Sequence, residues 1–349
     1  MIGYYVHHHG RGHLTRMLAV AAHLREELVG LSSLPAPDGW AGRWVELGPD
    51  DDPAVADEDD ADVRAGGVLH WAPRHHPGLG DRMAALASWV ARERPALVVV
   101  DVSVEVALLL RLCGVPVVVT AMPGDRTDRP HRAAHDLADA LLAPWPAEAH
   151  SRSWPESWTR KVWPVGGISR FDGLPRPTRV GTAHDASRVL LLWGAGGRDV
   201  DDAAVRAAQE ATPGWRWTER SPDAPSPDLW LELCTADVVV THAGQNAVAD
   251  VAAARAPAVV LAQHRPHGEQ QATVEALSRL DVADGRSTWP SAREWPDLLD
   301  RAQRRGGGGW ERWSTGRGAL AAATHLDALA GAQGGRATPP AALAGTRVS

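Results

Sequence analysis

The sequence contains a single lysine, Lys161, among its 36 basic side chains. It therefore has no GxxxxGK[ST] phosphate-binding loop. Lys161 stands in a Trp- and Pro-rich stretch, which makes it a poor candidate for a Schiff base. The net charge of −7 provides no basic surface for nucleic acid, and no apolar run reaches the roughly 20 residues of a membrane-spanning helix. These absences exclude several classes of function and favour a soluble globular protein.

Cysteine is equally scarce. The two cysteines, Cys113 and Cys234, lie far apart inside apolar segments, so we expect reduced thiols in the core of a cytoplasmic protein. The N-terminus reads as a strand without a basic start or a cleavable apolar segment, which argues against a signal peptide. If the protein acts on a lipid-linked molecule, we expect it at the inner face of the membrane.

Short apolar runs alternate with helix-like stretches along the chain. Strands are predicted at 1–6, 96–102, 116–121, 140–144, 188–194, 236–242 and 257–262, and helices at 14–28, 104–114, 245–254 and 316–330. This alternation indicates parallel sheets covered on both faces, and two such series indicate two doubly wound domains. We predict an α/β protein with an N-terminal domain at 1–165, a linker at 166–180, a C-terminal domain at 181–330 and a disordered tail at 331–349.

The stretch HHHGRGHLTR follows the first predicted strand. Gly10 and Gly12 let the backbone turn tightly and approach a ligand. His13 then begins the helix, where a neutral imidazole is suited to remove a proton near pH 7. Asp101 ends a parallel strand, from which it could orient His13 and stabilise the imidazolium. Alternatively, Asp101 caps the following helix, a role for which Ser103 competes.

Several other histidines raise the question of a metal. Neighbours on a strand point to opposite faces, so residues 7–9 cannot all bind one ion. HRAAH at 131–135 has helical i, i+4 spacing but lacks the glutamate of HExxH, so we expect a surface pair or an acceptor contact there. The sequence therefore predicts no metal site. His9 and Arg16 are candidate acceptor contacts, and Arg16 alternatively pairs with an Asp or Glu.

A third cluster, THAGQNAVAD at 241–250, follows the predicted strand at 236–242. Its small residues expose N–H groups at a helix N-terminus, which is an anion site. His242 and Asn246 would donate to a diphosphate, and Asp250 would accept from ribose hydroxyls. Glycines at 194–197 follow a neighbouring strand. The predicted donor-binding residues are Gly10, Gly12, Gly194, Gly196, Gly197, His242, Gly244, Gln245, Asn246, Asp250, Glu269, Gln270 and Gln271.

Taken together, these clusters resemble the GT-B glycosyltransferases, two-domain enzymes that use nucleotide sugars. Among them, the MurG-like and family-twenty-eight transferases are the most similar. HAGQNAVAD resembles their H-x-G-x-N-[ST]-x-x-E box, and GRGHLTR resembles the G-x-G-H turn of their N-terminal domain. The sequence departs from the box at Ala247, which replaces a Ser or Thr, and at Asp250, which replaces a Glu.

The resemblance implies two Rossmann-like domains with a cleft between them. It also implies transfer of a sugar from a nucleotide sugar to an acceptor hydroxyl, and it favours UDP as the nucleotide. Our hypothesis is that the transfer proceeds with inversion and without metal or cofactor. The C-terminal domain would bind the donor, with Glu269 and Gln270 at its sugar, and the N-terminal domain would bind an unidentified acceptor. His13 would act as base, with Asp101 behind it. Two alternatives remain, a nucleotide-sugar hydrolase of the nonulosonic acid type and a non-catalytic nucleotide-sugar-binding protein.

Overall fold

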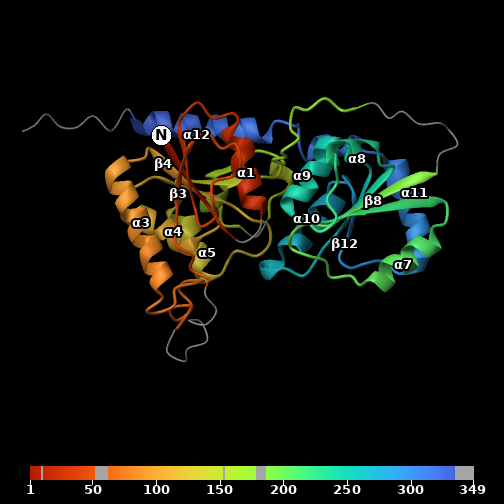
Figure 1. The fold of residues 1–349 in the computed structure, drawn as a ribbon, viewed down its shortest axis with the longest axis horizontal. Helices are drawn as coiled ribbons and strands as arrows, with labels where there is room; N and C mark the ends of the chain where they lie inside the picture. Colours follow the sequence, from red (N-terminus) through yellow and green to blue (C-terminus); the bar gives the residue numbers. More distant parts are fainter. Residues whose placement is uncertain (9–10, 52–61, 152–153, 178–185, 335–349) are drawn as a thin grey trace, which may run out of the picture.

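Two parallel β-sheets, each carrying helices, make up the protein (Figure 1). The computed structural model describes residues 1–8, 11–51, 62–151, 154–177 and 186–334. The seven-stranded sheet has the order β3-β2-β1-β4-β5-β6-β7, and the five-stranded sheet has the order β12-β11-β10-β8-β9. Both orders are those of doubly wound sheets, in which ligands bind beyond the carboxyl ends of the strands. The predicted fold class is confirmed.

The N-terminal half alternates strands with helices. Its strands are β1 (Ile2–Val6), β2 (Leu28–Ser32), β3 (Arg43–Glu46), β4 (Leu97–Asp101), β5 (Val117–Thr120), β6 (Ala140–Ala143) and β7 (Val162–Pro164). Its helices are α1 (Arg11–Ala21), α3 (Pro77–Glu93), α4 (Val104–Leu112), α5 (Arg129–Leu137), the 3₁₀ turn η1 (Ala147–Ala149) and α6 (Glu156–Thr159).

The C-terminal half repeats the scheme. Its strands are β8 (Ser187–Leu192), β9 (Trp215–Arg220), β10 (Val238–His242), β11 (Ala258–Leu261) and β12 (Asp284–Arg286). Its helices are α7 (Asp202–Ala211), α8 (Leu229–Thr235), α9 (Gln245–Ala254), α10 (Glu269–Arg279) and α11 (Trp295–Arg305), with 3₁₀ turns η2 (Pro266–Gly268), η3 (Ala292–Glu294) and η4 (Gly308–Arg312). The last helix is α12 (Gly318–Gly334).

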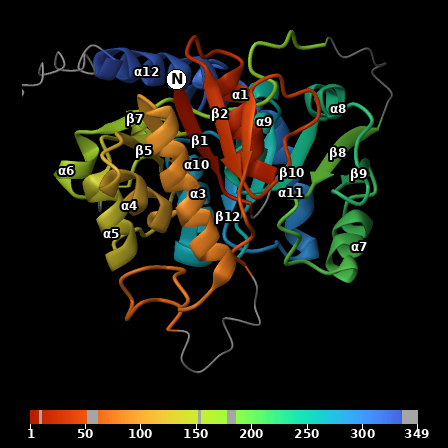
Figure 2. The same cartoon turned by 60° about the vertical axis from the view of Figure 1, so that its left-hand side comes forward.

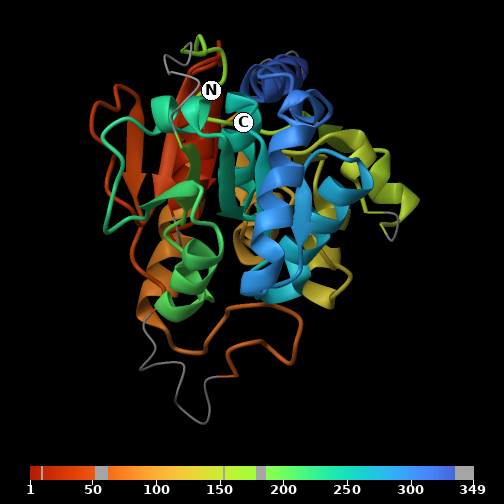
Figure 3. The ribbon, with the colours of Figure 1, turned by 90° about the vertical axis from the view of Figure 1, so that its right-hand side faces the viewer.

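The central strands of each sheet are buried on both faces, which explains why they read as continuous apolar runs. In the N-terminal half, α1 and α12 cover one face through Met17 and Leu326, and α3 and α4 cover the other through Trp89 and Leu110. In the C-terminal half, α7 and α11 cover one face, as Figure 3 shows from that side. Helices α8, α9 and α10 cover the opposite face.

Helix α12 follows the C-terminal half in sequence but packs on the N-terminal sheet. It packs against α1 (Figures 1 and 2), and its Ala319 and Leu326 are fully buried in one cluster with Ile2 and Tyr4. The predicted C-terminal domain was drawn to residue 330, whereas α12 packs on the N-terminal half. The predicted disordered tail at 331–349 overlaps the end of α12, and residues 335–349 lie outside the described residues. Burial of the apolar side of α12 decides this placement, because the sheet face beside α1 would otherwise be open.

The structure also differs from the predicted elements where strand pairing overrides the local helical propensity of the sequence. The helix predicted at 14–28 ends at Ala21, because Leu28 begins β2 and pairs with Ile2 in the sheet. Strands β3, β7, β9 and β12 are short or polar and escaped prediction. Cys113 was expected in the core but is exposed in the turn after α4. No helix in the described ranges is long and apolar enough to cross a membrane.

Candidate active site

His13 and Asp101 meet at the carboxyl edge of the N-terminal sheet. His13 lies in the first turn of α1, and Asp101 is the last residue of β4, which pairs with β1. Nδ1 of His13 lies 2.8 Å from Oδ1 of Asp101. An ionised carboxylate only accepts, so Nδ1 carries the proton and Nε2 is left as the basic nitrogen. The geometry is that of a histidine oriented by an aspartate.

The turn after β4 releases Asp101 for this contact. Ser103 caps α4 by accepting from the backbone N–H of Val106, so the capping role that competed for Asp101 belongs to Ser103. Val102, between them, has a φ of +67°, which is an outlier for a β-branched residue. Such strain persists where the surroundings fix it, commonly at functional sites.

Arg16 holds the buried carboxylate in its charged form. Its Nε lies 2.9 Å from Oδ2 of Asp101 and one terminal nitrogen lies 3.1 Å from Oδ1, and Tyr4 donates to Oδ2 at 3.2 Å. Burial alone would raise the pKa of Asp101, but the charge of Arg16 and the hydrogen bonds from Arg16 and His13 hold that pKa well below its usual range. Of the two readings of Arg16, the structure shows the pair with an aspartate.

In the C-terminal half, β10 and α9 form the predicted anion site. Gly244 is the N-cap of α9 and has no side-chain cap, so the first N–H groups of the helix are not satisfied by a capping side chain. Burial first, and then the charge of Arg265, lower the pKa of His242 to about 4, which leaves its imidazole neutral. Nδ1 of His242 accepts from the Gly244 N–H at 3.1 Å, so Nε2 is the donor. A Cβ on Gly194 would lie 2.5 Å from that nitrogen.

The two clusters touch each other across the halves. Asn246 donates from Nδ2 to the Gly12 carbonyl at 3.0 Å. Arg16 donates to Oε1 of Gln245 at 2.8 Å. The N-termini of α1 and α9 therefore lie side by side, as Figures 1 and 2 also show. This contact brings the His13–Asp101 pair to the predicted diphosphate site.

The remaining predicted donor residues have internal partners. Asp250 is buried, accepts from Ser169 at 2.7 Å and from Arg170 at 3.2 Å, and burial raises its pKa to about 6. Gln270, also buried, accepts from the backbone N–H groups of Ala243 and Gln263, so it fixes the loops beside the anion site. Contact of these two side chains with a donor stays a prediction.

Glu269 and Gln271 lie at the start of α10 with different partners. Glu269 forms an ion pair of 3.1 Å with Arg126 of the N-terminal half. Gln271 donates to Glu275 and to Ser287 within the C-terminal half. Glu269 therefore faces the cleft, where a donor sugar was predicted, whereas the described contacts of Gln271 stay within its own half.

The glycine turn after β8 faces the loop after β11. Arg265 donates to the carbonyl of Gly196, and Gln263 donates to that of Gly197. Gly197 has a φ of +77°, which favours glycine. The predicted residues His9 and Gly10 lie outside the described residues.

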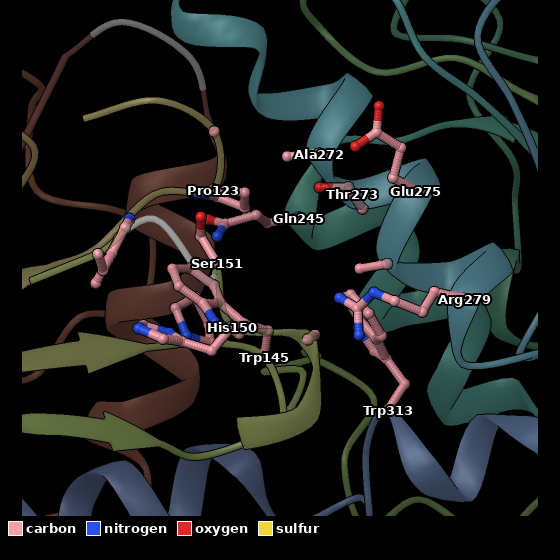
Figure 4. A pocket seen from close by; sticks show the side chains of 15 residues that line it. Pro123, Trp145, His150, Ser151, Gln245, Ala272, Thr273, Glu275, Arg279 and Trp313 are labelled. Atoms are coloured by element: carbon pink, nitrogen blue, oxygen red, sulfur yellow. The ribbon is translucent and has the colours of Figure 1, made fainter. Parts of the chain in front are cut away.

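Two cavities lie near these residues. One, of about 150 Å³, is in the N-terminal half and is lined by His7, Trp71, Ser103 and Met122 among others. The His7 ring centroid is 5.9 Å from that of His13, so this cavity lies beside the candidate base. The larger cavity, of about 230 Å³, separates α10 from the loop that carries Trp145 and His150 (Figure 4). Of the predicted donor residues it includes Gln245 alone.

One cluster was missed by the sequence analysis. His70, Asp128, His131 and His267 each offer one ligand atom, and these atoms all lie within 4.8 Å of one another. The i, i+4 pair in HRAAH drew attention to His131 and His135, but His135 packs against Trp158 instead. The presence of Asp128 three residues before His131 was the one local feature of the sequence that could have indicated this cluster. The other two histidines come from distant segments that a single sequence does not connect.

Comparison with known proteins supplies the fold. No family model matches the sequence, and no curated protein matches it. The chain is similar to the solved glycotransferase of kitacinnamycin (TM-score 0.66, 15% identity, covering 94% of this chain and 98% of that one). It is also similar to spinosyn rhamnosyltransferase SpnG complexed with thymidine diphosphate (0.54, 17%, 95% and 96%). A third similar structure is Phytolacca americana UGT2 complexed with UDP-2fluoro-glucose and pterostilbene (0.60, 15%, 96% and 98%).

These similarities extend over nearly the whole length of each chain, so both sheets and their connection are shared. A closer relation to the MurG-like transferases stays a prediction. This protein has two doubly wound sheets, with an aspartate-bound histidine at the edge of one and an uncapped helix N-terminus at the edge of the other. Its fold is that of the GT-B glycosyltransferases.

Proposed function

We propose that this protein is an inverting glycosyltransferase that moves a sugar from a nucleotide sugar to an acceptor hydroxyl. The observation that carries the proposal is the contact of the two sites. The His13–Asp101 pair of one half touches the N-terminus of α9 in the other through Asn246 and Gln245. Similar solved structures include glycosyltransferases with thymidine diphosphate and with a UDP-sugar analogue bound, which supports a nucleotide-sugar donor.

His13 would act as the general base. Nδ1 is bound to Asp101 at 2.8 Å, so Nε2 accepts the proton of the acceptor hydroxyl. Asp101 stays ionised because Arg16 pairs with it, and it stabilises the imidazolium that forms. The acceptor oxygen then attacks the anomeric carbon from the side opposite the leaving phosphate, which inverts the configuration.

The α9 N-terminus would receive the leaving diphosphate. Its N–H groups and the Nε2–H of His242 are preorganised donors, and they stabilise charge that develops on the phosphate without a metal ion. Asn246 now donates to the Gly12 carbonyl. In the donor complex the same amide would donate to a phosphate oxygen once α1 and α9 separate.

The cavity beside His7 and Trp71 would hold the acceptor. Its lining mixes apolar side chains such as Trp71 and Met122 with polar ones such as Ser103, Glu105 and Arg126. Such a lining suits a small molecule that combines an apolar body with hydroxyl groups. UGT2, one of the similar structures, is complexed with pterostilbene. The donor base is proposed to be uracil, and thymine, which differs from it by one methyl group, is the first competitor.

The experiment begins with calorimetric titration of UDP, dTDP, GDP and ADP. Wild-type protein should bind UDP most tightly, and His13→Ala should bind it equally well. The release of UDP from UDP-sugars is then followed with and without a panel of apolar alcohols and phenols. Release that requires the acceptor should fall by about 10²–10⁴-fold in His13→Ala.

Each other outcome identifies a different function. Release of UDP at the same rate without any acceptor favours the hydrolase. Tight nucleotide binding with no release under any condition favours the non-catalytic binding protein. Full turnover by His13→Ala contradicts the assignment of the base, and failure to bind any nucleotide contradicts the donor site at α9.

A further inference from the structure

A cluster of histidines joins the two halves at the cavity beside His7 and Trp71. His70 precedes α3, Asp128 and His131 lie at the start of α5, and His267 lies in η2 of the C-terminal half. Asp128 is central, because Nδ1 of His131 lies 2.8 Å from its carboxylate, Nδ1 of His267 lies 3.4 Å from it and Nε2 of His70 lies 3.6 Å from it. Three imidazoles therefore surround one carboxylate.

The spacing matches that of a tetrahedral metal site. Zn²⁺ binds histidine nitrogen and carboxylate oxygen at about 2.0–2.2 Å, so neighbouring ligand atoms in a tetrahedral site lie about 3.3–3.6 Å apart. Nδ1 of His267 lies 3.4 Å from Oδ2 of Asp128 and Nε2 of His70 lies 3.6 Å from its Oδ1. One ligand atom from each of the four residues lies within 4.8 Å of the others. Small side-chain rotations suffice to close the set around one ion.

Two further observations indicate that the cluster is built to hold a bound ion. Nε2 of His70 is buried and has no hydrogen-bond partner within the described part of the chain, which is costly for a polar atom unless something else satisfies it. His267 has a φ of +61°, uncommon for a residue other than glycine. Its carbonyl accepts from the N–H of Asp125 at 2.9 Å, which docks this left-handed turn on the N-terminal half.

The surroundings hold the ligands in place. Asp128 is also the N-cap of α5, where it accepts from the N–H of His131. Nε2 of His131 lies 3.4 Å from Arg126, so Nδ1 is the atom that faces the cluster. The charge of Arg126 is compensated by Glu269 at 3.1 Å. Asp128 therefore leaves the cluster with a negative charge that favours a cation.

We propose that His70, Asp128, His131 and His267 bind one Zn²⁺ ion, which clamps the N-terminal and C-terminal halves together. Imidazole ligands select zinc and related transition metals over Mg²⁺ and Ca²⁺, which take oxygen ligands. Three of the ligands come from one half and the fourth from the other, so binding draws η2 onto α5. His70 and His131 also line the cavity beside His7 and Trp71, and the role proposed for the ion is structural.

The test uses the full chain after chelator treatment. Zn²⁺ is titrated in competition with a chromophoric chelator, and Co²⁺ is added in parallel because tetrahedral Co²⁺ absorbs strongly in the visible. We expect one equivalent of tight Zn²⁺, the tetrahedral Co²⁺ spectrum and a higher melting temperature with Zn²⁺. His267→Asn tolerates the left-handed backbone, and Asp128→Asn keeps a capping side chain, so both variants should fold.

Each of these variants should bind Zn²⁺ at least tenfold more weakly and lose the thermal shift. His264→Ala, in the same loop but outside the cluster, is the matched control and should bind like the wild type. His8→Ala tests the other histidine-rich stretch. No bound equivalent, binding that survives both cluster variants, or binding that is lost in His8→Ala alone would overturn the proposal, and the cluster would then be a hydrogen-bonded network on Asp128.

Discussion

At the scale of single residues, the site depends on a buried carboxylate that has several donors. Asp101 is fully buried and interacts with His13, Arg16 and Tyr4. A buried ion is stable only when it is paired and hydrogen-bonded. Arg16 therefore allows Asp101 to orient His13 without becoming protonated, and we regard Arg16 as a positioning residue.

The first prediction concerns this pair. Arg16→Met leaves Asp101 buried without its cation, so the free energy of unfolding should fall by about 3–5 kcal/mol near pH 7. In the wild type the low pKa of Asp101 stabilises the fold above its ordinary value of about 4, and this stabilisation is lost as the pH falls through the depressed folded value. The difference between the proteins should therefore shrink at about pH 3.

Urea denaturation of both proteins at the two pH values measures this difference. Arg92→Met is the control, because the Arg92 side chain is 66% exposed and should change stability little. An equal loss at both pH values would show that lost packing, rather than lost charge pairing, causes the effect.

For Asp250 we expect the opposite dependence of stability on pH. Burial raises its folded pKa to about 6, above the ordinary value, so the folded state binds the extra proton and stability falls as the pH rises from about 4 to about 6. A shift of two units corresponds to roughly 3 kcal/mol. In Asp250→Asn this decline should disappear. Thermal melts across that pH range measure it, and an unchanged pH profile would assign the decline to other groups.

At the scale of elements, the sequence was informative where an apolar strand ends in polar residues. It predicted β1, β4, β10 and α9 closely, because fully buried strands and a glycine-started helix have strong local signals. It also placed His13 and Asp101 at neighbouring strand ends. It could not predict β2, whose pairing with β1 overrides local helical propensity, or the internal partners of Asp250 and Gln270, because these depend on tertiary contacts.

The next prediction concerns the glycine turn after β8, which lies against His242. Gly194→Ala places a Cβ 2.5 Å from Nε2 of His242, so the imidazole must move from the anion site. We expect nucleoside diphosphate binding to weaken about tenfold, or about 1.4 kcal/mol. Gly214→Ala is the matched control, because its Cβ meets nothing within 4 Å. Equal affinity for all three proteins in calorimetry would place the phosphates elsewhere.

At the scale of the whole molecule, the chain crosses between the halves twice and the crossings lie together. The N–H of Gly167 donates to the carbonyl of Trp313, and Ser314 donates to the carbonyl of Gly167. After the second crossing α12 returns to the N-terminal sheet. The halves are therefore tied at one end by paired segments, which suit a hinge, and at the cleft by the contacts of Asn246, Glu269 and His267.

Stability of the whole chain should depend on the return of α12. Leu326 is fully buried against the N-terminal sheet, so Leu326→Ala should lower the free energy of unfolding by about 2–5 kcal/mol. Leu112→Ala, at a side chain that is 85% exposed, should stay within about 0.5 kcal/mol. Tryptophan fluorescence during urea unfolding measures both. Because α12 is reached only after the C-terminal half, a loss of this size shows that the last segment of the chain stabilises the first domain, and a change under about 0.5 kcal/mol in Leu326→Ala contradicts this role of α12.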